Sequence, residues 1–211
     1  MKPMFKPINV LNYDDLLLDK YITNLYKSLD KTKYPAPYIV MGHSHGIYYA
    51  CEFAKQFKNK VKYIISLDGS WITNELNKKR LLTWKNKGRI IPEINNQKEL
   101  NEIINKIKNE KDNTKYINML ETYIRWSHTK FVIKQKYEKL KTPFITFRDF
   151  NSNNNDNIMK EYNDNVIEEN KILSKYDNHI IYVLLDASHM IWNNNNYKNT
   201  IINTIIMINK N

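Results

Sequence analysis

The sequence is poor in cysteine and has no long apolar run. Cys51 is the single cysteine among 211 residues, so neither an internal disulfide nor a thiolate zinc cage can form within the chain. No apolar run approaches the roughly 18 residues that a membrane-spanning helix needs. Residues 1–7 alternate polar and apolar side chains and lack the apolar core of a secretory signal. These absences predict a cytoplasmic, intracellular protein with no membrane span, no bound metal and no cofactor.

Arginine is also scarce, although the chain is basic. Lys and Arg number 33 against 22 Asp and Glu, which gives a net charge of +11. The arginines are Arg80, Arg89, Arg125 and Arg148, and the lysines are scattered among Glu and Asn. Because the guanidinium group of arginine is the side chain that most often recognises phosphate and guanine, this pattern favours no specific nucleic-acid partner. A basic nucleic-acid binder stays a third hypothesis that rests on the charge alone.

Hydrophobic periodicity predicts strands that alternate with helices. The strands are expected at 8–11, 38–41, 61–67, 143–147 and 180–185, with helices in the intervals and a last helix that reaches residue 208. Short spacing between the early strands indicates parallel βαβ units. The sequence therefore predicts one α/β domain over residues 1–211, with a mostly parallel sheet and helices on both faces.

Glycine is scarce too, and its placement is informative. Two of the 4 glycines bracket Ser44 in Gly42-His43-Ser44-His45-Gly46, between a predicted strand and a predicted helix. In a G-x-S-x-G turn only small residues are expected two positions either side of the serine, and the turn lifts the hydroxyl above the sheet. The backbone N–H of His45 would then point toward a developing oxyanion. The alternative is a tight turn that needs glycine and has no catalytic role.

This stretch resembles the nucleophile elbow of the α/β-hydrolase family, and the resemblance covers nearly the whole chain in order. It implies an α/β-hydrolase-like fold with Ser44 as nucleophile and no cofactor. The family normally has about three more strands before the one predicted at 8–11. The loop after one of those strands supplies a second oxyanion N–H. The resemblance thus implies a sheet that is short at its N-terminal side, with an open edge available to a partner or to a second copy.

A serine hydroxyl needs a base, and His189 is the candidate. It follows the last predicted strand in a stretch, 185–192, that resembles the family's catalytic histidine loop, although Ser188 stands where the family usually has glycine. The remaining histidines are expected to shape the turn or to lie in the core or on the surface: His43, His45, His128 and His179.

Three carboxylates compete for the role of the acid that orients the histidine. Asp149 ends the strand after which most of the family places its acid, and we expect it to fill the role. Asp68 ends the strand that follows the elbow helix, where a minority of families place the acid, and it is also consistent with an ordinary turn. Asp156 lies slightly later and is placed to cap the next helix.

Residues 72–139 interrupt the alternation, because they are typical of several helices in a row. We expect this segment to be a helical lid inserted in the domain. Its aromatic residues would either roof an apolar pocket over Ser44 or form the core of the insertion: Trp84, Tyr116, Tyr123 and Trp126.

The leading hypothesis is a serine hydrolase. It would cleave a small or medium apolar ester, thioester or amide through an acyl-enzyme on Ser44, so its partner is a small-molecule carbonyl substrate. The alternative is a catalytically inactive α/β-hydrolase-like domain that binds a ligand or a partner protein.

Overall fold

The structure is a computed structural model that describes residues 12–32, 34–86, 94–109, 111–152 and 157–210. The chain divides into two compact units. The helical unit comprises Met1–Lys33 and Asn77–Gln135, and the sheet unit comprises Tyr34–Leu76 and Lys136–Asn211. The helical unit therefore takes in the N-terminal segment together with most of the predicted insertion.

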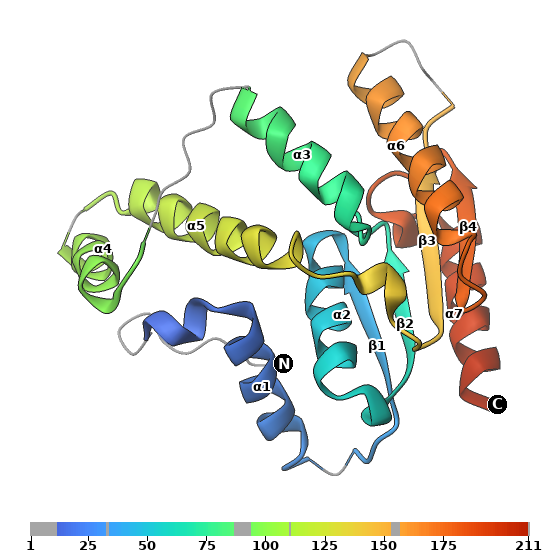
Figure 1. Ribbon diagram of the computed structural model, residues 1–211, viewed down its shortest axis with the longest axis horizontal. Coiled ribbons are helices and arrows are strands. Elements are labelled where there is room, and N and C mark those ends of the chain that lie inside the picture. Colours follow the sequence, from blue (N-terminus) through green and yellow to red (C-terminus); the bar gives the residue numbers. More distant parts are fainter. Residues whose placement is uncertain (1–11, 33, 87–93, 110, 153–156, 211) are drawn as a thin grey trace. The chain divides into compact units, whose positions relative to one another are not determined.

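The sheet unit is built on four parallel strands in the order β1-β2-β3-β4 (Figure 1). They are β1 (Tyr38–His43), β2 (Val61–Leu67), β3 (Phe144–Phe150) and β4 (His179–Leu185). Each of the last four predicted strands is confirmed, with ends that differ by at most three residues. The strand expected at 8–11 lies outside the described residues.

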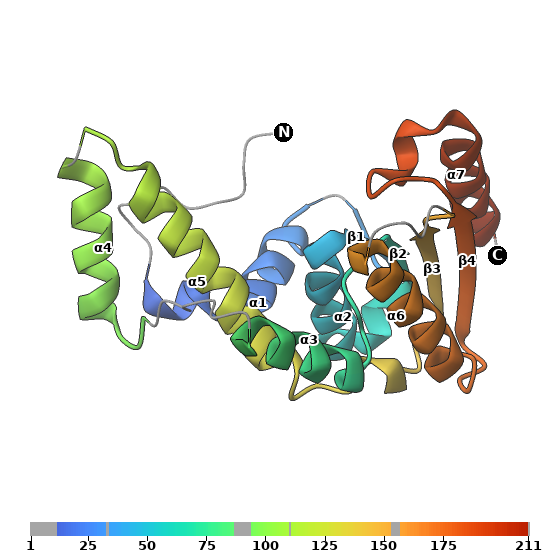
Figure 2. The ribbon, with the colours of Figure 1, turned by 90° about the horizontal axis from the view of Figure 1, so that it is seen from above.

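Helices cover both faces of this sheet, as the alternation predicts. They are α2 (Ile47–Gln56), α6 (Asn157–Leu173) and α7 (Asn195–Lys210). Figure 2 shows α7 on one face and α2 and α6 on the other. On the α7 face of the sheet, an apolar core joins β2, β3 and β4 to α7. Its members are Ile65, Leu67, Ile145, Phe147, Leu184, Ile201 and Ile208. The predicted α/β class with a parallel sheet is therefore confirmed.

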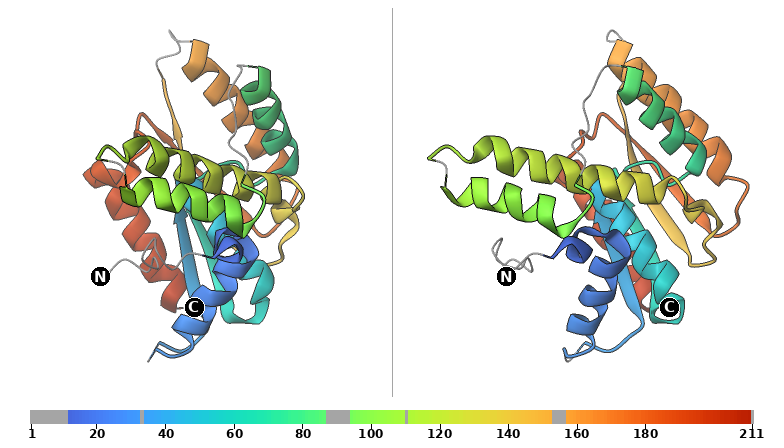
Figure 3. Two further views of the ribbon diagram at one scale, coloured as in Figure 1. Left: turned by 90° about the vertical axis from the view of Figure 1, so that its left-hand side faces the viewer. Right: turned by 60° about the vertical axis from the view of Figure 1, so that its left-hand side comes forward.

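The helical unit contains α1 (Leu18–Leu29), α4 (Gln97–Asn109), α5 (Thr114–Val132) and most of α3 (Asn74–Asn86). Helices α4 and α5 lie side by side in both views of Figure 3. Their facing side chains form a core of their own: Leu100, Ile104, Ile107, Leu120 and Tyr123. The predicted helices of 72–139 are thus present, and the lid role remains a prediction. No helix in the described ranges is long and apolar enough to cross a membrane.

Candidate active site

The turn after β1 has the geometry of a nucleophile elbow. Strand β1 ends at His43, a 3-10 turn covers Ser44–Gly46, and α2 begins at Ile47. Ser44 has φ 52°, a left-handed conformation that L-residues adopt only under constraint. A Cβ at Gly42 would lie 2.5 Å from the backbone N and Cα of Ile47, so only glycine fits there.

The expectation of a small residue on both sides of the serine is wrong for Gly46. Its backbone is right-handed, with φ −58° and ψ −19°, because the helix is already beginning at this position. Apart from its chain neighbours and the backbone of its own helix, a Cβ at Gly46 would meet no heavy atom within 4 Å in the described part of the chain. The close approach that the motif requires is therefore made by Gly42 alone.

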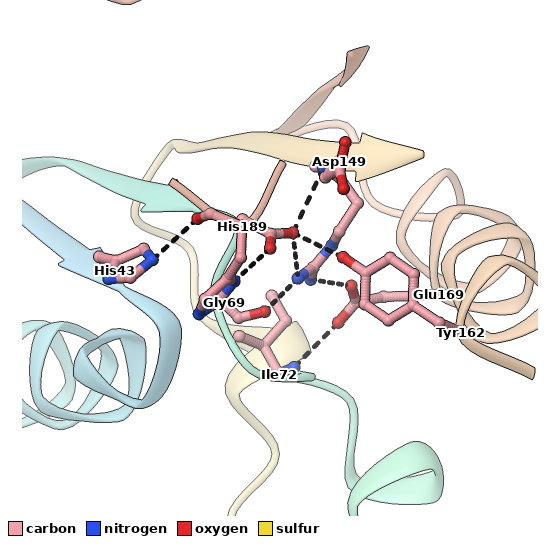
Figure 4. Close-up of polar contacts among 9 residues, drawn as sticks. His43, Gly69, Ile72, Asp149, Tyr162, Glu169 and His189 are labelled. Carbon is pink, nitrogen blue, oxygen red and sulfur yellow. Dashed lines mark hydrogen bonds and ion pairs between the residues drawn. The ribbon is translucent and has the colours of Figure 1, made fainter. Parts of the chain in front are cut away.

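The carboxylate of Asp68 contacts the imidazole of His189 (Figure 4). Its Oδ2 lies 2.5 Å from Nδ1 of the histidine, and the carboxylate is 4% exposed while the histidine side chain is exposed. The sheet register explains the placement, because His43 of β1 pairs with Leu67 of β2. Ser44 and Asp68 therefore leave adjacent parallel strands at the same level of the sheet.

His43 ties the histidine loop to the elbow. Its Nε2 donates a hydrogen bond to the carbonyl oxygen of His189 over 3.0 Å, and the two rings are 4.5 Å apart between centres. The ring of His43 also meets Trp192 edge-on at 4.6 Å. The loop that carries His189 is thus fixed against the residue that precedes Ser44.

The second oxygen of Asp68 has its own donors. Oδ1 accepts a hydrogen bond of 2.6 Å from the hydroxyl of Tyr162 and a longer one of 3.3 Å from the backbone N–H of Asp149. Burial raises the pKa of Tyr162 above its usual range, which keeps the hydroxyl protonated and able to donate. These donors leave Oδ2 of Asp68 facing His189.

The structure brings Asp68, and not Asp149, to His189. The carboxylate of Asp149 accepts a hydrogen bond from the backbone N–H of Ala187 at 2.8 Å, so it holds the loop that carries His189. Burial raises the pKa of Asp149, and the hydrogen bond from Ala187 opposes that rise. Asp156, the third carboxylate considered, lies outside the described residues.

A buried arginine lies behind Asp68, and the sequence patterns above do not predict its role. Arg148 is 2% exposed; it donates from Nη2 to the carboxylate of Glu169 and from Nη1 to the carbonyl of Gly69. Its guanidinium also lies 4.6 Å from the centre of the Trp71 ring. The available signal was an arginine within the apolar strand β3, next to Asp149.

The remaining histidines have structural surroundings, as expected. His128 on α5 donates from Nε2 to the carbonyl of Leu16 at 2.9 Å, and burial lowers its pKa to about 4. His179 stacks on Phe144 with ring centres 5.0 Å apart, and burial lowers its pKa to about 4 as well. The ring of His45 packs edge-on against Tyr48.

The aromatic residues of the predicted lid contribute to the core of the helical unit. Tyr123 is 7% exposed and donates its hydroxyl to the carbonyl of Ile94, and Tyr116 packs against the same cluster. Trp126 is also buried. The side chain of Trp84 lies outside the described residues. Within the described ranges, no three His, Cys, Asp or Glu side chains are grouped so as to hold a metal ion.

Solved structures resemble this chain in fold. An alpha/beta hydrolase enzyme from the metagenome of lagoon sediments at Mar Chica, Morocco, has a TM-score of 0.56 and 16% identity, with 97% of this chain and 76% of that one covered. MenH from S. aureus has a TM-score of 0.54 and 13% identity, with 98% and 80% covered. A probable hydrolytic enzyme from Pseudomonas aeruginosa PAO1 has a TM-score of 0.53 and 11% identity, with 89% and 69% covered.

These similarities show that the chain has the α/β-hydrolase fold, as the resemblance in its sequence implies. No protein-family model matches the sequence. No curated protein matches it in sequence either.

Proposed function

We propose that this protein is a serine hydrolase in which Ser44 is the nucleophile, His189 the base and Asp68 the acid that orients the base. The assignment replaces the expected Asp149 with Asp68. The substrate is a small or medium apolar ester, thioester or amide, and the reaction needs no cofactor.

One observation carries the proposal. The His189–Asp68 contact of 2.5 Å lies beside an elbow whose serine has a left-handed backbone. Here a serine, a carboxylate and a histidine follow the C-terminal ends of three strands of one parallel sheet. The same three side chains activate a serine in unrelated folds. The hydrogen bond from His43 to the His189 carbonyl supports it, because it keeps the base next to the elbow.

The reaction follows from these roles. Oγ of Ser44 attacks the carbonyl carbon while its proton passes to Nε2 of His189, and Asp68 holds the Nδ1–H of the resulting imidazolium. The backbone N–H of His45 donates to the negative oxygen of the tetrahedral intermediate. That intermediate collapses, and the leaving alcohol, thiol or amine takes the proton from His189. Water, deprotonated by the same histidine, then attacks the acyl-serine and releases the acid.

Covalent labelling tests the proposal directly. The purified full chain is treated with a fluorophosphonate probe, and the adduct is located by mass spectrometry, with Ser44→Ala and His189→Ala as controls. We expect a stoichiometric adduct on Ser44 that both substitutions abolish. A folded wild-type protein that forms no adduct would overturn the proposal and favour the ligand-binding alternative.

The acyl group is tested next. A series of p-nitrophenyl esters with two, four and eight acyl carbons, and the matching thioesters, is compared by kcat/KM. We expect hydrolysis of one or more apolar acyl groups, with a rise in kcat/KM up to the length that the site accommodates and a fall beyond it.

A further inference from the structure

Three ionisable side chains are buried together behind His189. Asp68, Arg148 and Glu169 are 4%, 2% and 1% exposed. Burying such a group costs free energy, and an apolar set of similar volume often gives equal or greater stability. Two carboxylates and one guanidinium leave this group with one net negative charge when all three are ionised. Its position against the imidazole suggests a role in the charge of the site rather than in the stability of the core.

Arg148 divides its contacts unequally between the two carboxylates. Its Nη2 hydrogen-bonds directly to Glu169, whereas its Nη1 lies 3.7 Å from Oδ1 of Asp68, beyond a hydrogen bond. The other oxygen of Glu169 accepts the backbone N–H of Ile72 at 2.9 Å. Burial raises the pKa of Glu169, and the charge of Arg148 and the N–H donor on each oxygen oppose that rise and favour the carboxylate. It therefore balances the guanidinium, and Asp68 keeps its negative charge for His189 (Figure 4).

Tyr162 acts on the same carboxylate from the same helix. Its position precedes Glu169 by seven residues, two turns of α6, so both side chains leave the same face of the helix. The tyrosine hydroxyl donates to Oδ1 of Asp68 at 2.6 Å, and its ring packs on Trp71 with centres 5.6 Å apart. A donor on Oδ1 takes up part of the negative charge of Asp68, while Oδ2 faces Nδ1 of His189.

We propose that Tyr162 and Glu169 are positioning residues of the proposed active site: from helix α6 they set the negative charge that Asp68 presents to His189. The inference rests on the proposed role of His189 as base. Glu169 acts by holding Arg148, and Tyr162 acts by its direct hydrogen bond. An imidazolium formed on His189 during the reaction then faces a full carboxylate rather than one already neutralised by the guanidinium.

Several titratable groups surround His189 and Asp68. Those that face His189, Asp68 or their direct neighbours in the described residues come from β1, β3, α6 and the loop after β4: His43, Arg148, Asp149, Tyr162, Glu169 and Asp186. Of these, Glu169 and Tyr162 are on α6 and reach the imidazole only through other side chains. Their substitution therefore changes how far neighbouring groups compensate the negative charge of Asp68, and it removes no contact of His189.

The test is an NMR titration of the His189 ring in the full chain with labelled histidine. The His189 signal is assigned by its absence from the His189→Gln variant. In Glu169→Gln, Arg148 loses its carboxylate and is left to Asp68, so we expect the midpoint to move down by roughly one pH unit. In Tyr162→Phe, Asp68 loses a donor that spreads its charge, so we expect the midpoint to move up by roughly half a unit.

The matched control is Glu161→Gln, which removes an exposed carboxylate from the same helix and is expected to keep the wild-type midpoint. If the two residues had only a structural role in α6, Glu169→Gln and Tyr162→Phe would both lower stability. The titration midpoint of His189 would then not move in opposite directions in the two variants. A folded Glu169→Gln or Tyr162→Phe with the wild-type midpoint would overturn the inference. If Glu169→Gln does not fold by circular dichroism, Tyr162→Phe, which removes one oxygen, decides alone.

This readout is separate from enzyme activity. Failure of Ser44 to react with the fluorophosphonate probe counts against the proposed function. An unmoved His189 midpoint counts against the positioning role of the two residues on α6. The two failures are therefore recognised by different measurements on the same protein samples.

Discussion

Asp68 and His189 lie 121 positions apart in the sequence, yet Oδ2 of the aspartate is 2.5 Å from Nδ1 of the histidine. The parallel sheet makes this contact, because residues that follow the C-terminal ends of β2 and β4 meet at one edge. Asp149 is the second-last residue of β3, which lies between those two strands, and its carboxylate accepts the backbone N–H of Ala187 instead. The fold thus places two aspartates around one loop and gives them different partners.

Substitution of each aspartate is expected to separate these roles. Asp68→Asn removes the charge that faces the imidazole, so the rate of Ser44 phosphonylation should fall on the order of 10² to 10⁴-fold. Asp149→Asn keeps an oxygen that accepts the N–H of Ala187, so its rate should stay within about tenfold of wild type. Stopped-flow labelling at pH 8 measures both. Equal losses in the two variants, or a larger loss in Asp149→Asn, would contradict the assignment of Asp68.

The two glycines of the elbow should respond differently to alanine. Gly42→Ala drives a Cβ into the backbone of Ile47 and is expected to cost roughly 2–3 kcal/mol of the free energy of unfolding. Gly46→Ala places a Cβ in open space on a right-handed backbone, so the change should be below about 1 kcal/mol. Urea denaturation measures both values. Equal destabilisation by the two substitutions would show that the turn is tighter at Gly46 than its geometry indicates.

Much of the fold follows from local sequence pattern. The pattern predicts a strand over 61–67, and β2 occupies Val61–Leu67, because an apolar run that is closed by Asp68-Gly69 leaves few alternatives. Ser44 and His189, the proposed nucleophile and base, are similarly marked by short motifs in the chain. Ser188, placed where the family usually has glycine, has φ 68°, which shows why glycine is favoured there.

The choice of Asp68 as the proposed acid, and the contacts around it, follow from no local pattern. Asp68 and Asp149 both end apolar strands, and only the three-dimensional path of the loop after β4 decides which of them meets His189. The contact of Arg148 with Glu169 likewise depends on how α6 packs on β3. Such long-range pairs have no signature in one sequence, apart from the unusual presence of an arginine in an apolar strand.

Replacement of Ser188 by glycine should stabilise the sheet unit. The left-handed φ of 68° costs a serine about 1 kcal/mol, and the extra freedom of glycine in the unfolded chain offsets part of that gain. We expect a rise of about 0.5 kcal/mol in the free energy of unfolding, or roughly 1–2 °C in Tm. The control is Ser174→Gly, at an exposed serine that is not among the residues with positive φ, which should lower Tm. A fall of Tm in Ser188→Gly would contradict this account of the loop.

The stability of the protein should decrease in acid partly because of His179. Burial lowers the pKa of His179 to about 4 in the folded state, below the ordinary value of about 6.5 that applies when the chain is unfolded. The unfolded state therefore binds the proton more tightly, so this contribution is fully present above pH 6.5 and is lost as the pH falls from 6.5 toward 4. Between pH 7 and pH 5 the loss amounts to roughly 2 kcal/mol.

His179→Phe isolates this effect. Phenylalanine keeps an aromatic ring against Phe144 but cannot take up a proton, so the variant should lose roughly 2 kcal/mol less stability than wild type between pH 7 and pH 5. Urea denaturation at the two pH values gives the difference for each protein. His128 is present in both proteins and contributes equally, as do all the carboxylates, so these contributions cancel in the comparison. Equal losses in the wild type and the variant would mean that His179 is protonated as readily in the folded state as in the unfolded chain, and that its burial does not exclude the charged ring.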